Sequence, residues 1–167
     1  MKPLTQISLA ALMTVGLTTA AVAAKPSAAT ADYLAKAGAS DLYEKTSSQL
    51  VLKSSKNAEV RKHANHMITD HAKSTAQVKA AARAAGITPK PPMLMAKQKS
   101  DVAALRAASG DARDRLYVEQ QRAAHQEALA VHQGYSRSGD TPSLKAAATQ
   151  IVPVVQSHIE MFARTNP

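Results

Sequence analysis

The feature that most constrains this chain is a long helical pattern between Asn57 and Ala85. With about 100° of rotation per residue, its apolar and small side chains recur on one narrow stripe, as on the face that a helix buries. His71 lies in the middle of that stripe, within the motif Met67-x-x-Asp70-His71. The pattern therefore predicts a helix that turns a titratable side chain toward the interior of the protein.

Three other segments repeat this arrangement, each with one titratable side chain in phase with a mainly apolar stripe. Glu44 is in phase with Tyr33, Ala37 and Val51, His125 with Tyr117, Gln121 and Ala128, and His158 with Leu144, Ile151, Val155 and Phe162. β-Branched alternation, which is typical of strands, is almost absent. These stripes predict an all-α four-helix bundle with one titratable group per helix near the axis.

Local signals place the ends of the helices. Thr30 is the expected N-cap of the first helix and Asn57 that of the second, which ends at Gly86. Prolines between residues 87 and 92 exclude a helix there. The predicted helices cover about residues 30–53, 57–85, 93–108, 112–136 and 142–163. This order predicts a ferritin-like bundle of two helical hairpins joined by a long connection that contains an extra helix.

Residues 1–24 have the pattern of a secretory signal peptide. Basic Lys2 is followed by a short apolar run and by small residues in an A-x-A arrangement. We expect cleavage near Ala23 or Ala24, a bundle domain over residues 25–167, and a periplasmic or otherwise exported location. A membrane anchor is the alternative, but polar and small residues interrupt the apolar run. The mature chain then has no apolar segment long enough to cross a bilayer.

Composition excludes several kinds of chemistry and partner. The chain has no cysteine, which rules out disulfides, thiolate-bound zinc and thiol catalysis. Its net charge of +9 favours contact with anionic envelope surfaces. Nucleic acid is not an expected partner, since no basic patch is interleaved with aromatic side chains for stacking. A protein partner stays open.

Short motifs along the whole mature chain resemble those of one family. They are Asn57-x-Glu59-Val60, Met67-x-x-Asp70-His71, Asp114-x-x-Tyr117, Ala124-His125-Gln126 and Pro153-x-x-x-x-His158. The chain resembles a bacterial exported family catalogued as a domain of unknown function (DUF4142), often described as a predicted outer-membrane or periplasmic protein. The resemblance runs from about Ala31 to Phe162. It implies a ferritin-like bundle and export, and no established activity. One departure is Arg113, where the pattern usually has an aromatic residue.

The inward titratable groups form a candidate metal site. Imidazole and carboxylate ligands suit a divalent transition metal such as Zn, Cu, Ni or Fe. The candidate ligands are Glu44, His71, His125 and His158, and the candidate residues around them are Asp70, Tyr117, Gln121 and His132. A weaker candidate lies on the surface of the second helix, where His63 and His66 share a flank with Asp70. The alternative for the inner group is a polar network that fixes helix register without a metal.

No enzyme motif accompanies these residues. A di-iron bundle needs Glu-x-x-His on two helices, and this motif is absent from the sequence. The chain also lacks a G-x-S-x-G elbow and a glycine-rich phosphate loop. The leading hypothesis is a non-enzymatic exported bundle in envelope or stress physiology. A periplasmic metal-binding protein is the alternative, and a basic module that binds anionic envelope surfaces is a second alternative.

Overall fold

The structure is a computed structural model that describes residues 25–167, so the predicted signal peptide lies outside the described residues. Over that range it contains five helices and no strand, which confirms the all-α prediction. The helices are α1 (Ala28–Leu52), α2 (Ala58–Ala84), α3 (Ala96–Ala107), α4 (Gly110–Ser138) and α5 (Pro142–Arg164). None of them is both long and apolar enough to span a membrane.

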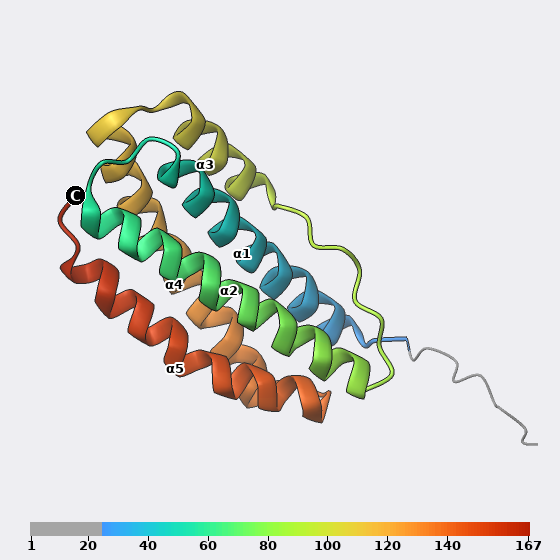
Figure 1. The fold of residues 1–167 in the computed structure, drawn as a ribbon. Coiled ribbons are helices and arrows are strands. Elements are labelled where there is room, and N and C mark those ends of the chain that lie inside the picture. The colour runs from blue at the N-terminus through green and yellow to red at the C-terminus, as the bar shows by residue number, and fades with distance from the viewer. Residues whose placement is uncertain (1–24) are drawn as a thin grey trace, which may run out of the picture.

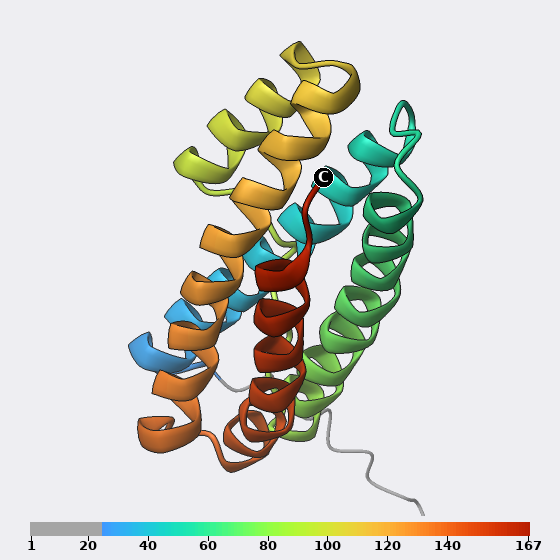
Figure 2. The same cartoon turned by 90° about the vertical axis from the view of Figure 1, so that its left-hand side faces the viewer.

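The long helices form two antiparallel hairpins, α1 with α2 and α4 with α5 (Figure 1). The hairpins pack through α1 against α4 and through α2 against α5, which closes a four-helix bundle. Helix α3 lies outside it, against α1 and α4 (Figure 2). The connection from α2 to α3 runs back along the length of the bundle (Figure 1). This is the predicted ferritin-like connectivity, with the extra helix in the long connection.

The start of α1 differs from the prediction. Ser27 is the N-cap, and its side chain accepts a hydrogen bond from the Thr30 amide at 3.0 Å. Thr30 is instead fully buried, where its hydroxyl donates to Asp140 at 2.7 Å and lies 2.6 Å from the Tyr135 hydroxyl. The assignment of Thr30 as the cap was therefore wrong, because this hydroxyl joins α1 to the turn between α4 and α5.

Both predicted ends of α2 are confirmed. The Asn57 side chain accepts from the amides of Glu59 and Val60, as an N-cap does. At the other end Gly86 has φ 71°, and the amide of Ile87 bonds to the carbonyl three residues before the C-cap. This is a Schellman ending, which needs a residue in the left-handed region and therefore favours glycine.

Helix α4 begins inside the segment that was predicted as a break. Its first residue is Gly110, which has φ 52° and so makes the sharp turn out of α3 without strain. Nearby, Arg113 donates to the Ala108 carbonyl and to the Ser54 hydroxyl, both at 2.7 Å. The guanidinium at this unusual position thus ties the α3–α4 turn to the α1–α2 loop.

Two apolar clusters fill the two ends of the bundle. One contains Tyr33, Ala37, Val78, Ala82, Ile87, Ala128, Tyr135, Leu144, Ala148, Ile151 and Val155. The other contains Val51, Val60, Ala64, Met67, Leu105, Tyr117, Val118 and Phe162. Along every long helix, the segment between these clusters carries at least one buried titratable side chain. The candidate site therefore lies in the middle of the bundle, with apolar packing on both sides.

Candidate metal centre

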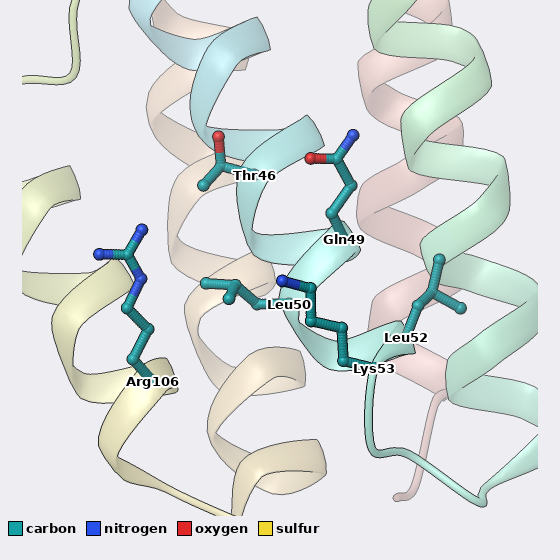
Figure 3. Close-up of a pocket in the computed structure, with 6 residues that line it drawn as sticks. All are labelled: Thr46, Gln49, Leu50, Leu52, Lys53 and Arg106. Carbon is teal, nitrogen blue, oxygen red and sulfur yellow. The ribbon is translucent and has the colours of Figure 1, made fainter.

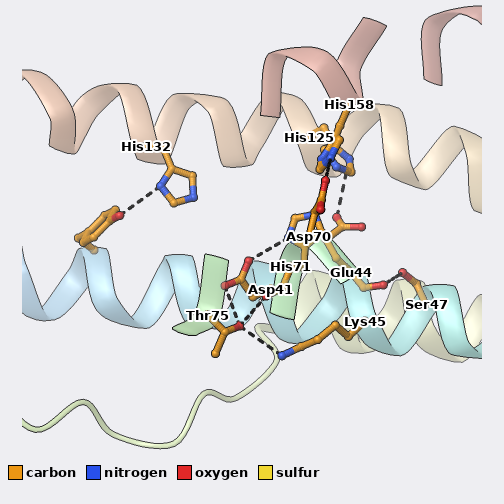
Figure 4. Close-up of polar contacts among 11 residues, drawn as sticks. Asp41, Glu44, Lys45, Ser47, Asp70, His71, Thr75, His125, His132 and His158 are labelled. Carbon is orange, nitrogen blue, oxygen red and sulfur yellow. Dashed lines mark hydrogen bonds and ion pairs between the residues drawn. The ribbon is translucent and has the colours of Figure 1, made fainter. Parts of the chain in front are cut away.

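Three imidazoles from three helices converge in this middle layer. His71 comes from α2, His125 from α4 and His158 from α5, and all three are buried. Their ring centroids are 5.2–5.6 Å apart, and one nitrogen of each ring lies within 4.8 Å of the other two (Figure 4). We call His71, His125 and His158 the histidine triad.

Glu44 enters the same layer from α1 and is also buried. Its side chain points toward the imidazoles (Figure 4), and its Oε1 lies 3.9 Å from Nδ1 of His125. The carboxylate is not in the group of ligand atoms that meet within 4.8 Å. The structure therefore places Glu44 beside the triad, and its role as a ligand stays a prediction.

Each ring of the triad has one nitrogen against a hydrogen-bond acceptor. The contacts are His71 Nδ1 to Asp41 Oδ1 at 2.9 Å, His125 Nδ1 to the Gln121 carbonyl at 2.8 Å, and His158 Nε2 to Asp70 Oδ2 at 3.2 Å. A carbonyl or an ionised carboxylate can only accept, so in each neutral ring this nitrogen carries the proton. The opposite nitrogen then carries a lone pair. These bonds set both the tautomer and the orientation of the rings.

The atoms left over are the ones a metal would use. His71 Nε2, His125 Nε2, His158 Nδ1 and both carboxylate oxygens of Glu44 are buried, and no hydrogen-bond partner for them exists among residues 25–167. A buried polar atom without a partner costs about 1–3 kcal/mol and is uncommon. Here five such atoms sit in one layer, and each is an electron-pair donor when it carries no proton. A group of this kind is stabilised by a cation, which is either a proton or a metal ion.

Burial sets the protonation states of the layer. It raises the pKa of Glu44 to about 7, although the neighbouring His71 opposes this shift. It lowers the pKa of His125 to about 3 and that of His158 to about 4, in both cases assisted by the charge of His71. Burial also acts to lower the pKa of His71, but the Asp41 hydrogen bond and the Glu44 charge raise it overall. At neutral pH, His125 and His158 are therefore neutral, with free lone pairs.

Asp41 was not predicted, although it supplies the carboxylate for His71. It lies three residues before Glu44 on α1, a spacing that places two side chains on the same face of a helix. That spacing was the signal in the sequence. The second oxygen of Asp41 accepts from the Thr75 hydroxyl at 2.9 Å, so the carboxylate is held at both atoms.

The other predicted partners lie at different distances from the triad. Gln121 contributes its main-chain carbonyl, whereas its side-chain amide donates to Ser47 at 3.2 Å. The Tyr117 hydroxyl bonds to Ser48 at 2.8 Å and does not reach the imidazoles. His132 lies apart from the triad (Figure 4), with its Nδ1 3.2 Å from the Tyr33 hydroxyl. Of these partners, Asp70 and Gln121 hold triad rings directly.

The two surface histidines of α2 take different partners. Nδ1 of His63 lies 3.0 Å from the Thr165 hydroxyl, near the end of the chain. His66 lies 2.8 Å from Asp70, and these two residues form a second potential ligand group with His158. The structure thus separates His63 from the predicted surface group and brings in a buried member of the triad.

A surface cavity of about 410 Å³ lies away from this layer, against the outer side of α1 and the end of α3 (Figure 3). Its basic side chains are Lys53 and Arg106, and its other lining residues are Thr46, Gln49, Leu50 and Leu52. It shares no residue with the triad. The predicted contact with anionic envelope surfaces is not located by this cavity and stays a prediction.

Comparison with known proteins places the chain in a family without an assigned activity. A crystal structure of a DUF305 fragment from Deinococcus radiodurans superposes with a TM-score of 0.71 and 17% identity, covering 82% of this chain and 94% of that one. At this identity the likeness shows the fold alone. No protein with a curated description matches. The family described as "Domain of unknown function (DUF4142)" matches residues 16–164, so this chain belongs to the DUF4142 family.

Proposed function

We propose that this protein is a non-enzymatic, exported helical bundle that binds one divalent transition-metal ion through the histidine triad. The observation that carries the proposal is the pairing of contacts on each ring. One nitrogen of every imidazole is held by an acceptor, and the other is buried and unpartnered among the described residues. Histidines that bind metals have this arrangement, because the outer bond fixes the tautomer and makes the ring a better ligand.

The same contacts favour a metal over the alternative of a polar network. A network that fixes helix register is stable when every member has a partner, and a partly satisfied one costs more than an apolar core. In this layer the bonds run outward from the rings to Asp41, Asp70 and the Gln121 carbonyl. The inward atoms are left for a ligand that accepts electron pairs.

The donor set indicates the class of metal. Three neutral imidazoles suit Zn²⁺, Cu²⁺, Ni²⁺ or Fe²⁺, and the absence of cysteine removes the softest ligand. We propose Glu44 as the fourth ligand, which requires its carboxylate to move toward the unpartnered nitrogens of the triad. Four protein ligands close a tetrahedral zinc site, and a closed buried site suits ion binding rather than substrate turnover.

The test is metal content together with thermal stability. The mature chain is purified without an affinity tag or chelator, its metal is measured, and Zn²⁺ is then added stepwise to the metal-free protein. We expect one ion per chain. An ion at about 100 times its Kd adds about 2.7 kcal/mol, which corresponds to a rise in Tm of roughly 5–10 °C for a chain of this size.

His125→Ala is the variant that identifies the site, and His132→Ala is its matched control. Both positions are buried imidazoles on α4, but only His125 belongs to the triad. We expect His125→Ala to lose the bound ion and the rise in Tm, while His132→Ala keeps both. Substoichiometric metal and an unchanged Tm with Zn²⁺, Cu²⁺, Ni²⁺ and Fe²⁺ would refute the proposal.

Export is part of the proposal and has its own test. It depends on the signal-peptide pattern of residues 1–24 and on the small residues near Ala24. When the full chain is expressed in a Gram-negative bacterium, the periplasmic protein should have the mass of a chain whose first residue is residue 24 or 25. A full-length mass in the cytoplasmic fraction would contradict export.

A further inference from the structure

A second group of ligands connects the triad with solvent. Nε2 of His66 lies 2.8 Å from Oδ2 of Asp70, and the same oxygen lies 3.2 Å from Nε2 of His158. One ligand atom from each of the three residues lies within 4.8 Å of the others. We call His66, Asp70 and His158 the outer cluster. It shares His158 with the triad.

Exposure changes in steps along the outer cluster. The side chain of His66 is 50% exposed, that of Asp70 is 19% exposed and that of His158 is 3% exposed. His158 uses its Nε2 toward Asp70, and its other nitrogen has no partner among the described residues. The single ring of His158 therefore faces the outer cluster with one nitrogen and offers the other as a triad ligand.

We infer that the outer cluster is the entry site at which a divalent transition-metal ion first binds before it passes to the triad; this inference rests on the proposed function. The triad nitrogens are buried, so an ion from solvent must lose its water before it reaches them. A half-exposed imidazole and a carboxylate replace that water near the surface. His158 belongs to both sites, with Nε2 toward the outer cluster and Nδ1 free for the triad, so the two sites are one imidazole ring apart.

Protons balance this exchange. Before the ion binds, hydrogens on Nε2 of His66 and on Nε2 of His158 point to Asp70 Oδ2. An ion at the outer cluster takes the place of these hydrogens, and each neutral ring then carries its proton on Nδ1 instead, so no net proton is released. When the ion moves to the triad, both rings return the proton to Nε2, the hydrogen bonds to Asp70 form again, and Nδ1 of His158 is free to bind the ion. Lys73 holds the other carboxylate oxygen at 3.0 Å throughout.

The test is the rate at which the metal-free mature chain takes up Co²⁺. Bound cobalt is followed by its visible absorption, which changes when the ion exchanges its shell of six waters for a protein site of lower coordination number. The variant is His66→Ala, a half-exposed position whose loss leaves the core intact. The matched control is His63→Ala, a histidine of the same helix that bonds to Thr165 and lies outside the outer cluster.

An entry residue alters rates and leaves equilibrium unchanged. We expect uptake by His66→Ala to be slower by about tenfold, which corresponds to a barrier to entry that is higher by about 1.4 kcal/mol. Release to a chelator should slow by the same factor, so that Kd and the final absorbance match the wild type. His63→Ala should behave as the wild type in all three measurements.

Three outcomes would overturn the inference. Uptake by His66→Ala at the wild-type rate means that ions enter elsewhere. A weaker Kd with faster release means that His66 supports the triad and is not an entry ligand. Equal slowing in both variants means a general effect of surface charge. In each case the wild type still binds one ion and the proposed function stands. A wild type that takes up no ion refutes the proposed function itself.

Discussion

The two apolar clusters and the polar layer between them have opposite effects on the fold. The clusters bury large apolar side chains such as Leu144 and Phe162, which stabilises the bundle. The layer buries three imidazoles and a carboxylate and leaves five of their atoms without partners among the described residues, which destabilises it. An apolar layer of the same volume would give a more stable bundle. The comparison teaches that the ends hold the helices together, whereas the middle carries buried polar groups at a cost in stability, as the proposed binding of an ion would require.

The variant that should best separate the effects of the two regions is Leu144→Ala. Leu144 is fully buried in the cluster at the start of α5 and belongs to neither ligand group. Its truncation should lower the free energy of unfolding by about 2–5 kcal/mol, the sum of lost burial and a new cavity. Denaturant titration measures this loss, and metal analysis should still give one ion per chain. Loss of the ion would show that the ends and the middle are not independent.

Acid should weaken the metal-free protein through the middle layer. His125 and His158 have pKa values lowered to about 3 and about 4, so between pH 6.5 and pH 4 the unfolded chain binds more protons than the folded one. The contribution of these two histidines to the free energy of unfolding is therefore present above pH 6.5 and is lost as the pH falls. Since one pKa unit corresponds to about 1.4 kcal/mol, the loss is large.

Glu44 provides the control for this pH effect, because its shift has the opposite sign. Its pKa is raised from 4.5 to about 7, so it lowers stability as the pH rises through that interval. Glu44→Gln should make the acid loss steeper, whereas His125→Gln should make it shallower. Urea midpoints at pH 4.5 and pH 7 measure both. A pH dependence that neither variant changes would place its origin outside the layer.

Asp41→Asn tests the layer without removing a ligand. The amide keeps the size of the side chain but loses the charge that holds His71, so the affinity for Zn²⁺ should fall by about 10–100-fold. Asp114→Asn is the comparison, since Asp114 is also buried but bonds to Ser55 away from the triad. It should leave zinc affinity unchanged, as competition with a chelating dye will show. Equal losses in both variants would point to a general effect on folding.

The smallest expected effect is that of Thr75→Val. The Thr75 hydroxyl donates to Oδ2 of Asp41, and it therefore acts on the His71 ring through that carboxylate. Its loss should cost about 1 kcal/mol of stability or less and reduce zinc affinity by less than tenfold. The same dye competition measures it. An effect as large as that of Asp41→Asn would mean that the hydroxyl, and not the carboxylate, sets the position of His71.

Much of the fold could be predicted because local chemistry determined it. Asn57 and Gly86 end α2 through their own side chain or backbone preference, and the periodicity around His71 set its inward face. The prediction of Thr30 as an N-cap failed because a threonine hydroxyl can either cap a helix or make a buried hydrogen bond between helices. Only the position of Tyr135, far along the chain, decides between them.

The sequence could predict that the side chains of the site face the bundle axis, but not where each one lies along that axis. Periodicity predicted an inward face for Glu44 and the triad, whereas the offset between the two hairpins along the axis decides which groups meet. That offset brings the three imidazoles together and leaves Glu44 beside them. The hydrogen-bond partners of the rings could also not be predicted from the periodicity of the sequence. Asp41 holds a ring of another helix, and Gln121 acts through its backbone.

The triad draws its rings from both hairpins, since His71 lies on α2 while His125 and His158 lie on α4 and α5. An ion bound there would join two parts of the chain that are separated by the whole α2–α4 connection. Closing so long a loop lowers the entropy of the unfolded chain, which is also how a disulfide stabilises a protein. In a chain without cysteine, the ion would be a cross-link that a chelator can open.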